Sequence, residues 1–262
     1  MASSSTLKRA GQREAEISRR AAPREISPLG GQRSTRSDKR GGHRLTLFDL
    51  DHTLLRGDSD VLWCNFLITQ GVLDRKSFSA RNAEMEARYK AGTVGMEEFA
   101  NFYVGTLGGR SPKEWEPLRQ TFLRSEIAPR ITRSAVELVD RHLNAGDLVV
   151  MTTATNRFIT ELTAIFFNIE HLIATEPQQE NGVFTGRTTG VLNMREGKVT
   201  RLHDWLTASG HKCKNFKSTV YSDSINDLPL LKAADRAVAV DPDPLLHAQA
   251  LRWGWDIVSL SR

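Results

Sequence analysis

Several short stretches of this sequence place acidic, hydroxyl and basic side chains directly after apolar runs, in combinations that suit phosphoryl transfer. The first, LTLFDLDHTLLRGDSD, puts Asp49 and Asp51 two residues apart behind an apolar run. One carboxylate of such a pair can attack phosphorus while the other, when protonated, gives a proton to the leaving group. A carboxylate nucleophile divides the hydrolysis of a phosphate ester into two easier steps, because an acyl phosphate forms and is then hydrolysed.

Other candidate residues supply the positive charge that this chemistry needs. A carboxylate and a phosphate repel each other, so a cation must lie between them, and Mg²⁺ takes carboxylate and phosphate oxygens as ligands. The acidic stretch SDSIND offers Asp223 and Asp227 for this purpose. Lys198, at the expected start of a helix, could neutralise the transferring oxygens. Thr153, with the backbone N–H groups around it such as that of Ala154, could hydrogen-bond to them.

Each of these stretches, taken alone, also has an ordinary structural interpretation. DLDHT, TTATN and SDSIND all suit helix caps or turns, and Lys198 could be a solvated surface lysine. Their shared position at strand ends is harder to explain by capping alone. Ligands of open α/β sheets gather outside the carboxyl ends of the strands, so residues that end several strands can form one site.

The elements that must position these residues can be read from the alternation of apolar runs with helical patterns. Short apolar runs typical of buried strands are found at 45–50, 148–151, 171–174, 219–221, 237–240 and 257–260. Helical patterns follow several of them, at 134–145, 157–167 and 198–209. This order predicts an α/β fold of the Rossmann-like, doubly wound kind, with a mostly parallel sheet covered on both faces.

Two interruptions break this alternation. Residues 61–129 carry no strong strand pattern and have apolar residues at helical spacing, such as Trp63, Phe66 and Leu67, so we expect a helical cap inserted after the first strand. The expected domains are a core of residues 44–62 and 130–262 and a cap of residues 63–129. The second interruption, GVFTGRTTGVLNMREGK, is rich in Gly and Thr and predicts a β-hairpin or loop before the helix at Lys198.

The order of these motifs resembles that of the haloacid dehalogenase superfamily, subfamily IB, the phosphoserine-phosphatase-like branch. DLDHTL is similar to the first motif of that family, VVMTTATN to the second, GKVTRL to the lysine motif and YSDSINDLPLL to the acidic fourth motif. The resemblance covers about residues 45–240. It implies a Mg²⁺-dependent phosphatase with a helical cap that closes over the substrate.

The resemblance also implies a role for each matching residue. Asp49 corresponds to the nucleophile and Asp51 to the general acid, which later acts as the base for water. Thr153, Ala154 and Lys198 correspond to phosphate-binding residues. Asp223, together with Asp49 and the main-chain carbonyl of Asp51, corresponds to the metal site, and Asn226 and Asp227 to supporting residues. The second motif has TAT where phosphoserine phosphatases commonly have SGG. A hydroxyl for binding phosphate is kept, but the difference argues that the substrate need not be phosphoserine.

The substrate is expected to be a small phosphate monoester that carries an amine. Asp58 stands where the branch places an acidic residue for the amine of phosphoserine, and Asp60 follows it, but no cap arginine matches the expected carboxylate clamp. The stretch GDSDVLW resembles bacterial histidinol-phosphate phosphatases of this branch. Histidinol phosphate is therefore the predicted substrate. The alternatives are phosphoserine, or a non-catalytic binding protein on the same fold.

Composition limits the remaining functional classes. Residues 1–44 hold 11 Lys or Arg and 4 Asp or Glu, whereas the other 218 residues hold 25 and 27, so the basic character belongs to the amino-terminal tail. We expect residues 1–43 to be a disordered tail, and nucleic-acid binding to be unlikely because no aromatic residues separate the charges. Two scattered cysteines, and the lack of a secretion signal or membrane segment, predict a cytoplasmic protein.

Overall fold

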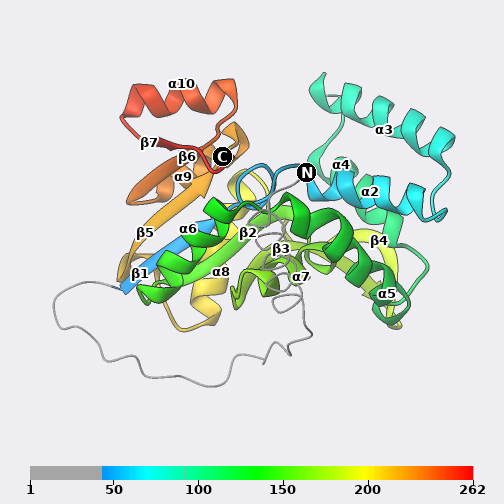
Figure 1. Cartoon of the computed structure of the whole chain (residues 1–262), viewed down its shortest axis with the longest axis horizontal. Coiled ribbons are helices and arrows are strands. Elements are labelled where there is room, and N and C mark those ends of the chain that lie inside the picture. The colour runs from blue at the N-terminus through cyan, green and yellow to red at the C-terminus, as the bar shows by residue number, and fades with distance from the viewer. Residues whose placement is uncertain (1–42, 92, 262) are drawn as a thin grey trace, which may run out of the picture.

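Seven strands form one sheet at the centre of the molecule, in the order β4-β3-β2-β1-β5-β6-β7 (Figure 1). The structure is a computed structural model and describes residues 43–91 and 93–261. All neighbouring strands are parallel except β4, which is antiparallel to β3. The strands are β1 (His43–Phe48), β2 (Leu148–Asn156), β3 (His171–Glu180), β4 (Val183–Thr189), β5 (Phe216–Ser222), β6 (Arg236–Val240) and β7 (Asp256–Val258).

Helices cover both faces of this sheet, because the side chains of each buried strand alternate between two apolar clusters. Leu45 and Leu47 of β1 join the cluster that contains α8, α9 and α10, whereas Phe48 joins the cluster that contains α6 and α7. The helices of the core are α6 (Arg133–Asn144), α7 (Arg157–Phe166), α8 (Glu196–Ala208), α9 (Leu228–Ala233) and α10 (Pro244–Trp253). The predicted doubly wound α/β fold is confirmed.

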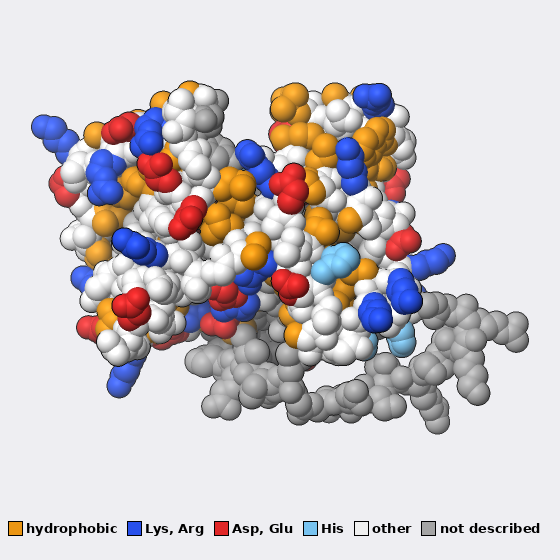
Figure 2. Space-filling view, turned by 180° about the vertical axis from the view of Figure 1, so that it is seen from behind, with side chains coloured by type: hydrophobic (Ala, Val, Ile, Leu, Met, Phe, Trp, Pro, Cys, Tyr) orange, Lys and Arg blue, Asp and Glu red, His pale blue; other side chains and the backbone are white. Residues whose placement is uncertain are grey.

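The chain between β1 and α6 forms a helical segment, which we define as residues 59–130. Its helices are α2 (Ser59–Thr69), α3 (Arg75–Lys90), α4 (Met96–Val104), α5 (Pro112–Phe122), the π-helix η2 (Leu123–Ile127) and two short 3-10 turns, Gly105–Leu107 and Ala128–Arg130. In Figure 1, α2, α3 and α4 lie together at one side of the molecule, away from α10. Figure 2 shows a notch in the surface between these two parts.

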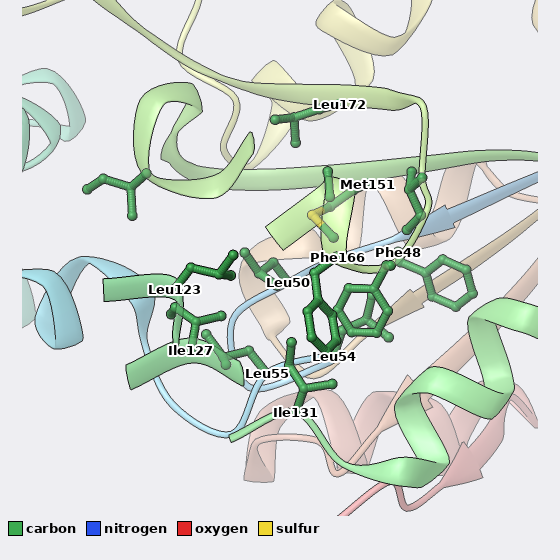
Figure 3. Packing of buried hydrophobic residues seen from close by; sticks show 14 of the residues in the cluster. Phe48, Leu50, Leu54, Leu55, Leu123, Ile127, Ile131, Met151, Phe166 and Leu172 are labelled. Carbon is green, nitrogen blue, oxygen red and sulfur yellow. The ribbon is translucent and has the colours of Figure 1, made fainter. Parts of the chain in front are cut away.

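Two linkers join the helical segment to the sheet, and they lie side by side. The backbone N–H of Arg56 donates to the carbonyl of Arg130 at 3.1 Å, and Leu55 forms a bridge with Ile131. Leu55 and Ile131 pack with Leu123 and Ile127 in one buried apolar group (Figure 3). The entry and exit of the helical segment are therefore anchored in the main core.

The β3–β4 hairpin reaches from the sheet to the helical segment. Asn181 and Gly182 form its tight turn with φ values of 52° and 78°, as a two-residue hairpin turn requires. Phe184 exchanges backbone hydrogen bonds with Gly109 and Arg110. A Cβ atom at Gly186 would lie 3.4 Å from the Gly105 Cα atom, so these two backbones approach closely.

Some element boundaries differ from those expected from the sequence. β1 begins at His43, one residue before the expected core, and the expectations about the rest of the tail lie outside the described residues. α2 begins at Ser59, inside the segment expected to belong to the core, because Asp58 caps it by accepting from the Val61 N–H at 2.9 Å. The last strand ends at Val258, two residues earlier than predicted. Among the described residues, no helix has the length and apolar character needed to cross a bilayer.

Candidate active site

The strand register brings three of the predicted motifs to one edge of the sheet. Phe48 at the end of β1 pairs with Met151 of β2 on one side and with Tyr221 of β5 on the other. The next residue, Asp49, donates its backbone N–H to the Tyr221 carbonyl at 3.0 Å. The TTAT and SDSIND stretches therefore begin beside Asp49, at the carboxyl ends of parallel strands, where ligands of such sheets bind.

Lys198 forms the centre of a buried ion-pair cluster. Its Nζ atom lies 2.6 Å from Asp49 Oδ1 and 2.6 Å from Asp227 Oδ2, and the lysine is only 2% exposed. Ser222 Oγ donates to the same Asp227 oxygen at 2.7 Å. The two carboxylates raise the pKa of Lys198 against the effect of burial, so its ammonium stays charged.

The position of Lys198 depends on a close backbone contact in the loop before α8. A Cβ atom on Gly197 would overlap the Leu192 carbonyl oxygen, so only glycine fits there. Asn193 anchors the same loop to the sheet, because its Nδ2, with two hydrogens to donate, lies 2.9–3.0 Å from three acceptors: Thr152 Oγ1 and the carbonyls of Thr153 and Ile173. The loop thus fixes the start of α8 next to the end of β2.

Asp51 is held at both carboxyl oxygens. Its Oδ1 accepts the backbone N–H of Ser59 at 2.8 Å, and its Oδ2 accepts the hydroxyl of Thr155 at 2.9 Å. Burial first, and then the charges of Asp58 and Asp49, raise the pKa of Asp51 to about 7, against the lowering effect of the Ser59 hydrogen bonds. A carboxyl group with a pKa near neutrality can both give and take a proton under ordinary conditions.

Asp49 and Asp223 form a second pair of acidic side chains. Burial raises the pKa of Asp49 to about 6 although Lys198 lowers it, and burial followed by the charge of Asp49 raises that of Asp223 to about 8. Thr53 orients Asp223, since its hydroxyl donates to Asp223 Oδ1 at 3.0 Å. Two neighbouring, largely buried carboxylates ionise together more readily when a further positive charge lies beside them.

A hard divalent cation fits this donor set. In the described part of the chain, no three His, Cys, Asp or Glu side chains are arranged to hold a metal on their own. Magnesium is commonly held by one or two carboxylates, with waters and substrate oxygens completing the octahedron. The pair formed by Asp49 and Asp223 matches that preference.

The remaining predicted residues differ in their exposure and in their hydrogen-bond partners. Thr153 is fully buried at the end of β2, and its hydroxyl accepts from the Thr155 N–H at 3.2 Å, while Ala154 between them is exposed. Asn226 has an exposed side chain, and its backbone N–H donates to Ser224 Oγ. Asp58 caps α2, whereas Asp60 turns toward Thr155, with 3.3 Å between Asp60 Oδ2 and Thr155 Oγ1.

Several residues that contact the predicted set were given no individual role by the sequence. Among them are Thr53, Ser59, Thr155, Ser222 and Asn193. Thr155 and Ser222 stand inside the polar stretches that end β2 and β5, so their location at strand ends is the available signal. Ser59 and Asn193 lie in stretches that look like a helix start and a loop, and their contacts depend on tertiary packing.

Comparison with known proteins identifies relatives over most of the chain. Residues 46–232 match the family of haloacid dehalogenase-like hydrolases. A histidinol-phosphatase of Neisseria meningitidis is 35% identical over 82% of this chain and 98% of its own length. The phosphoserine phosphatase SerB1 of Mycobacterium tuberculosis is 30% identical over 80% of this chain and 68% of its own length. A crystal structure of a Bordetella pertussis Tohama I protein of unknown function has a TM-score of 0.81 and 42% identity, covering 84% of this chain and 99% of that one.

Proposed function

Since this chain belongs to the haloacid dehalogenase-like hydrolase family and is a phosphatase, we propose that it hydrolyses a small phosphate monoester through a phosphorylated Asp49. The observation that carries this proposal is the placement of Asp49. It directly follows the central strand β1, and Lys198 binds one of its carboxyl oxygens at 2.6 Å in a buried site. The family match and the phosphatase relatives set aside the alternative of a non-catalytic binding protein.

The proposed reaction has two steps that share one proton carrier. In the first step, a carboxylate oxygen of Asp49 attacks phosphorus, the ester P–O bond breaks, and protonated Asp51 gives its proton to the leaving oxygen. In the second step, Asp51 takes a proton from water as that water attacks phosphorus, and the bond from phosphorus to Asp49 breaks. A pKa of about 7 suits Asp51 to both tasks.

The charged and hydroxyl groups around Asp49 would bind the transferring phosphate. The Lys198 ammonium offsets negative charge on its oxygens, and Asp227 keeps Lys198 in place through the 2.6 Å ion pair. Thr153 and the exposed residue Ala154 follow Met151, which pairs with Phe48 directly before Asp49, so their hydroxyl and N–H groups could bind phosphate oxygens. Asn226, in the short turn after β5, would support the neighbouring Asp227.

We further propose that Asp49, Asp223 and the main-chain carbonyl of Asp51 hold Mg²⁺. The metal would supply positive charge between the nucleophile and the phosphate, which otherwise repel each other. The two raised pKa values support this assignment, because a bound dication would let both carboxyl groups ionise. We also propose that the helical segment, which a notch separates from the part of the molecule that contains α10 (Figure 2), covers the substrate.

We propose histidinol phosphate as the substrate, with Asp58 and Asp60 near its cationic groups. The relative from Neisseria meningitidis, a histidinol-phosphatase, matches along nearly its whole length. Two arginines of the helical segment that could bind the carboxylate of an amino-acid phosphate already have partners. Arg88 pairs with Glu98 at 2.8 Å, and Arg110 lies over the Trp115 ring. Phosphoserine remains the second candidate because SerB1 is 30% identical.

A substrate panel tests these proposals. Phosphate release is measured from histidinol phosphate, phosphoserine and 4-nitrophenyl phosphate, each with Mg²⁺ and with a chelator. We expect release that needs Mg²⁺, a preference for histidinol phosphate, and no turnover by Asp49→Asn. A preference for phosphoserine would overturn the substrate proposal alone. Full activity of Asp49→Asn would overturn the proposed reaction.

A further inference from the structure

The hydroxyl of Thr155 lies at the centre of a buried polar network that joins the sheet to the helical segment. Thr155 Oγ1 is 2.9 Å from Asp51 Oδ2, 3.1 Å from Ser59 Oγ and 3.3 Å from Asp60 Oδ2. Thr155 is 3% exposed and Ser59 is 1% exposed, so water does not replace these contacts. Thr155 is the penultimate residue of β2, whereas Ser59 is the first residue of α2.

The donor count assigns a direction to this network. A threonine hydroxyl has one hydrogen, and the shortest of its three contacts is the one to Asp51. With that hydrogen given to Asp51, Thr155 Oγ1 accepts from the Ser59 hydroxyl, which has its own hydrogen to donate. The chain of hydrogen bonds therefore runs from Ser59 through Thr155 to Asp51 Oδ2.

The second oxygen of Asp51 is fixed independently of the first. Asp51 Oδ1 accepts the backbone N–H of Ser59 at 2.8 Å. A carboxyl group that is bonded at one oxygen can still rotate about its Cβ–Cγ bond, whereas one bonded at both oxygens from two different elements cannot. Removing the Thr155 hydroxyl would free this rotation while it leaves the Ser59 N–H bond in place.

We propose that Thr155 is a positioning residue that holds the Asp51 carboxyl in the orientation in which it exchanges a proton with the substrate's leaving oxygen. The proposal rests on the proposed role of Asp51 as general acid. Proton transfer needs a hydrogen-bond distance and a good angle, and small misplacements cost large factors in rate. Thr155 does not touch phosphate in this proposal, so phosphate binding is left unchanged.

Isosteric variants separate this role from a structural one. Thr155→Val keeps the shape of the side chain and removes the hydroxyl, and Thr155→Ser restores a hydroxyl. Thr160→Val is the matched control, because Thr160 is also a fully buried threonine, and its hydroxyl donates to the carbonyl of Asn156, the N-cap residue of α7, rather than to a proposed catalytic side chain. Ser59→Ala removes the outer hydroxyl and keeps the backbone N–H. Ser59→Ala therefore tests the same network by a second route, and it keeps the proposal testable if Thr155→Val does not fold.

The readout is kcat/KM for two esters that differ in their need for an acid. 4-Nitrophenyl phosphate has a leaving group that departs without a proton. The alkyl ester that the wild type hydrolyses, histidinol phosphate or phosphoserine, has a leaving group that needs one. For Thr155→Val we expect a loss of about 10- to 100-fold on the alkyl ester and less than about 3-fold on the aryl ester. Thr155→Ser and Thr160→Val should stay within about 3-fold of the wild type on both, and Ser59→Ala should show a smaller loss confined to the alkyl ester.

Inhibition by inorganic phosphate completes the test. We expect the inhibition constant to be the same for the wild type and Thr155→Val. An equal loss on both esters, no loss on the alkyl ester, or weaker phosphate binding by Thr155→Val would overturn the positioning role. If the wild type hydrolysed neither ester, the proposed function itself would fail, which is a separate result.

Discussion

Replacing Lys198 by methionine should destabilise the protein in a way that depends on pH. Methionine keeps the length and apolar stem of the side chain and removes the ammonium that lies 2.6 Å from both Asp49 and Asp227. The variant leaves two buried carboxyl groups without their cation. Breaking a buried ion pair by removing one partner costs about 3–5 kcal/mol when the remaining group stays ionised.

The pH dependence follows from the raised pKa of Asp49. That pKa is about 6 in the wild type because burial raises it while Lys198 lowers it, so it must lie higher without Lys198. A carboxyl with a raised folded-state pKa keeps its proton in the folded protein, and stability is lost as pH rises toward that pKa. When the folded protein binds one more proton than the unfolded chain, the free energy of unfolding falls by about 1.4 kcal/mol for each unit that the pH rises. The destabilisation should therefore grow by about 2–3 kcal/mol between about pH 6 and about pH 8.

Urea unfolding followed by circular dichroism, in the presence of a chelator, measures this difference. Lys232→Met is the matched control, since Lys232 is exposed and its Nζ lies 4.5 Å from the centre of the Trp253 ring. The control should lose no more than about 1 kcal/mol at either pH. A loss for Lys198→Met that is equal at both pH values, or smaller at the higher one, would refute the claim that Lys198 neutralises these carboxyl groups.

Three further predictions concern the metal, the loop before α8 and the start of α2. Mg²⁺ should raise the melting temperature more at about pH 8 than at about pH 6, because the raised pKa values of Asp49 and Asp223 favour their protonated forms at the lower pH. An equal rise in melting temperature at both pH values would contradict this prediction. Gly197→Ala should lower the free energy of unfolding by about 1–3 kcal/mol and lower kcat, since the added Cβ would overlap the Leu192 carbonyl. Gly95→Ala, whose Cβ meets open space, is the control and should change neither. An unaltered kcat in Gly197→Ala would argue against the importance of the backbone contact. Asp58→Ala should lose about 1 kcal/mol in urea unfolding because the N-cap of α2 is removed, and wild-type stability would show that the cap contributes nothing.

The arrangement of the sheet and the meeting of the acidic motifs could be predicted because both depend on local patterns. Each apolar run contributes to a strand, all of them largely buried except β7, and parallel strands must bring the polar residues that follow them to the same edge. Asp49 and Asp223 lie at that edge for this reason. The phosphate-binding role of Lys198 was predicted from the family resemblance, whereas its burial between Asp49 and Asp227 depends on tertiary packing and could not be read from the sequence.

Contacts between distant side chains could not be predicted in the same way. Ser59 and Thr155 are 96 positions apart, and each has a local interpretation, as a helix start and as the end of a strand. The sequence grouped Asp58 and Asp60 as residues that select the substrate, but it could not show that Asp58 caps α2 while Asp60 faces Thr155. The backbone approach of Gly186 to Gly105 likewise depends on how the hairpin meets the helical segment.

Chemical trapping of the phosphorylated enzyme tests the central claim most directly. The enzyme is mixed with a radiolabelled phosphate ester and Mg²⁺, quenched in acid within a single turnover, and digested for peptide mapping. The account predicts a label on the peptide that contains Asp49, released by hydroxylamine as an acyl phosphate is, and no label in Asp49→Asn. Product formation without any labelled peptide, or a label on another residue, would contradict it.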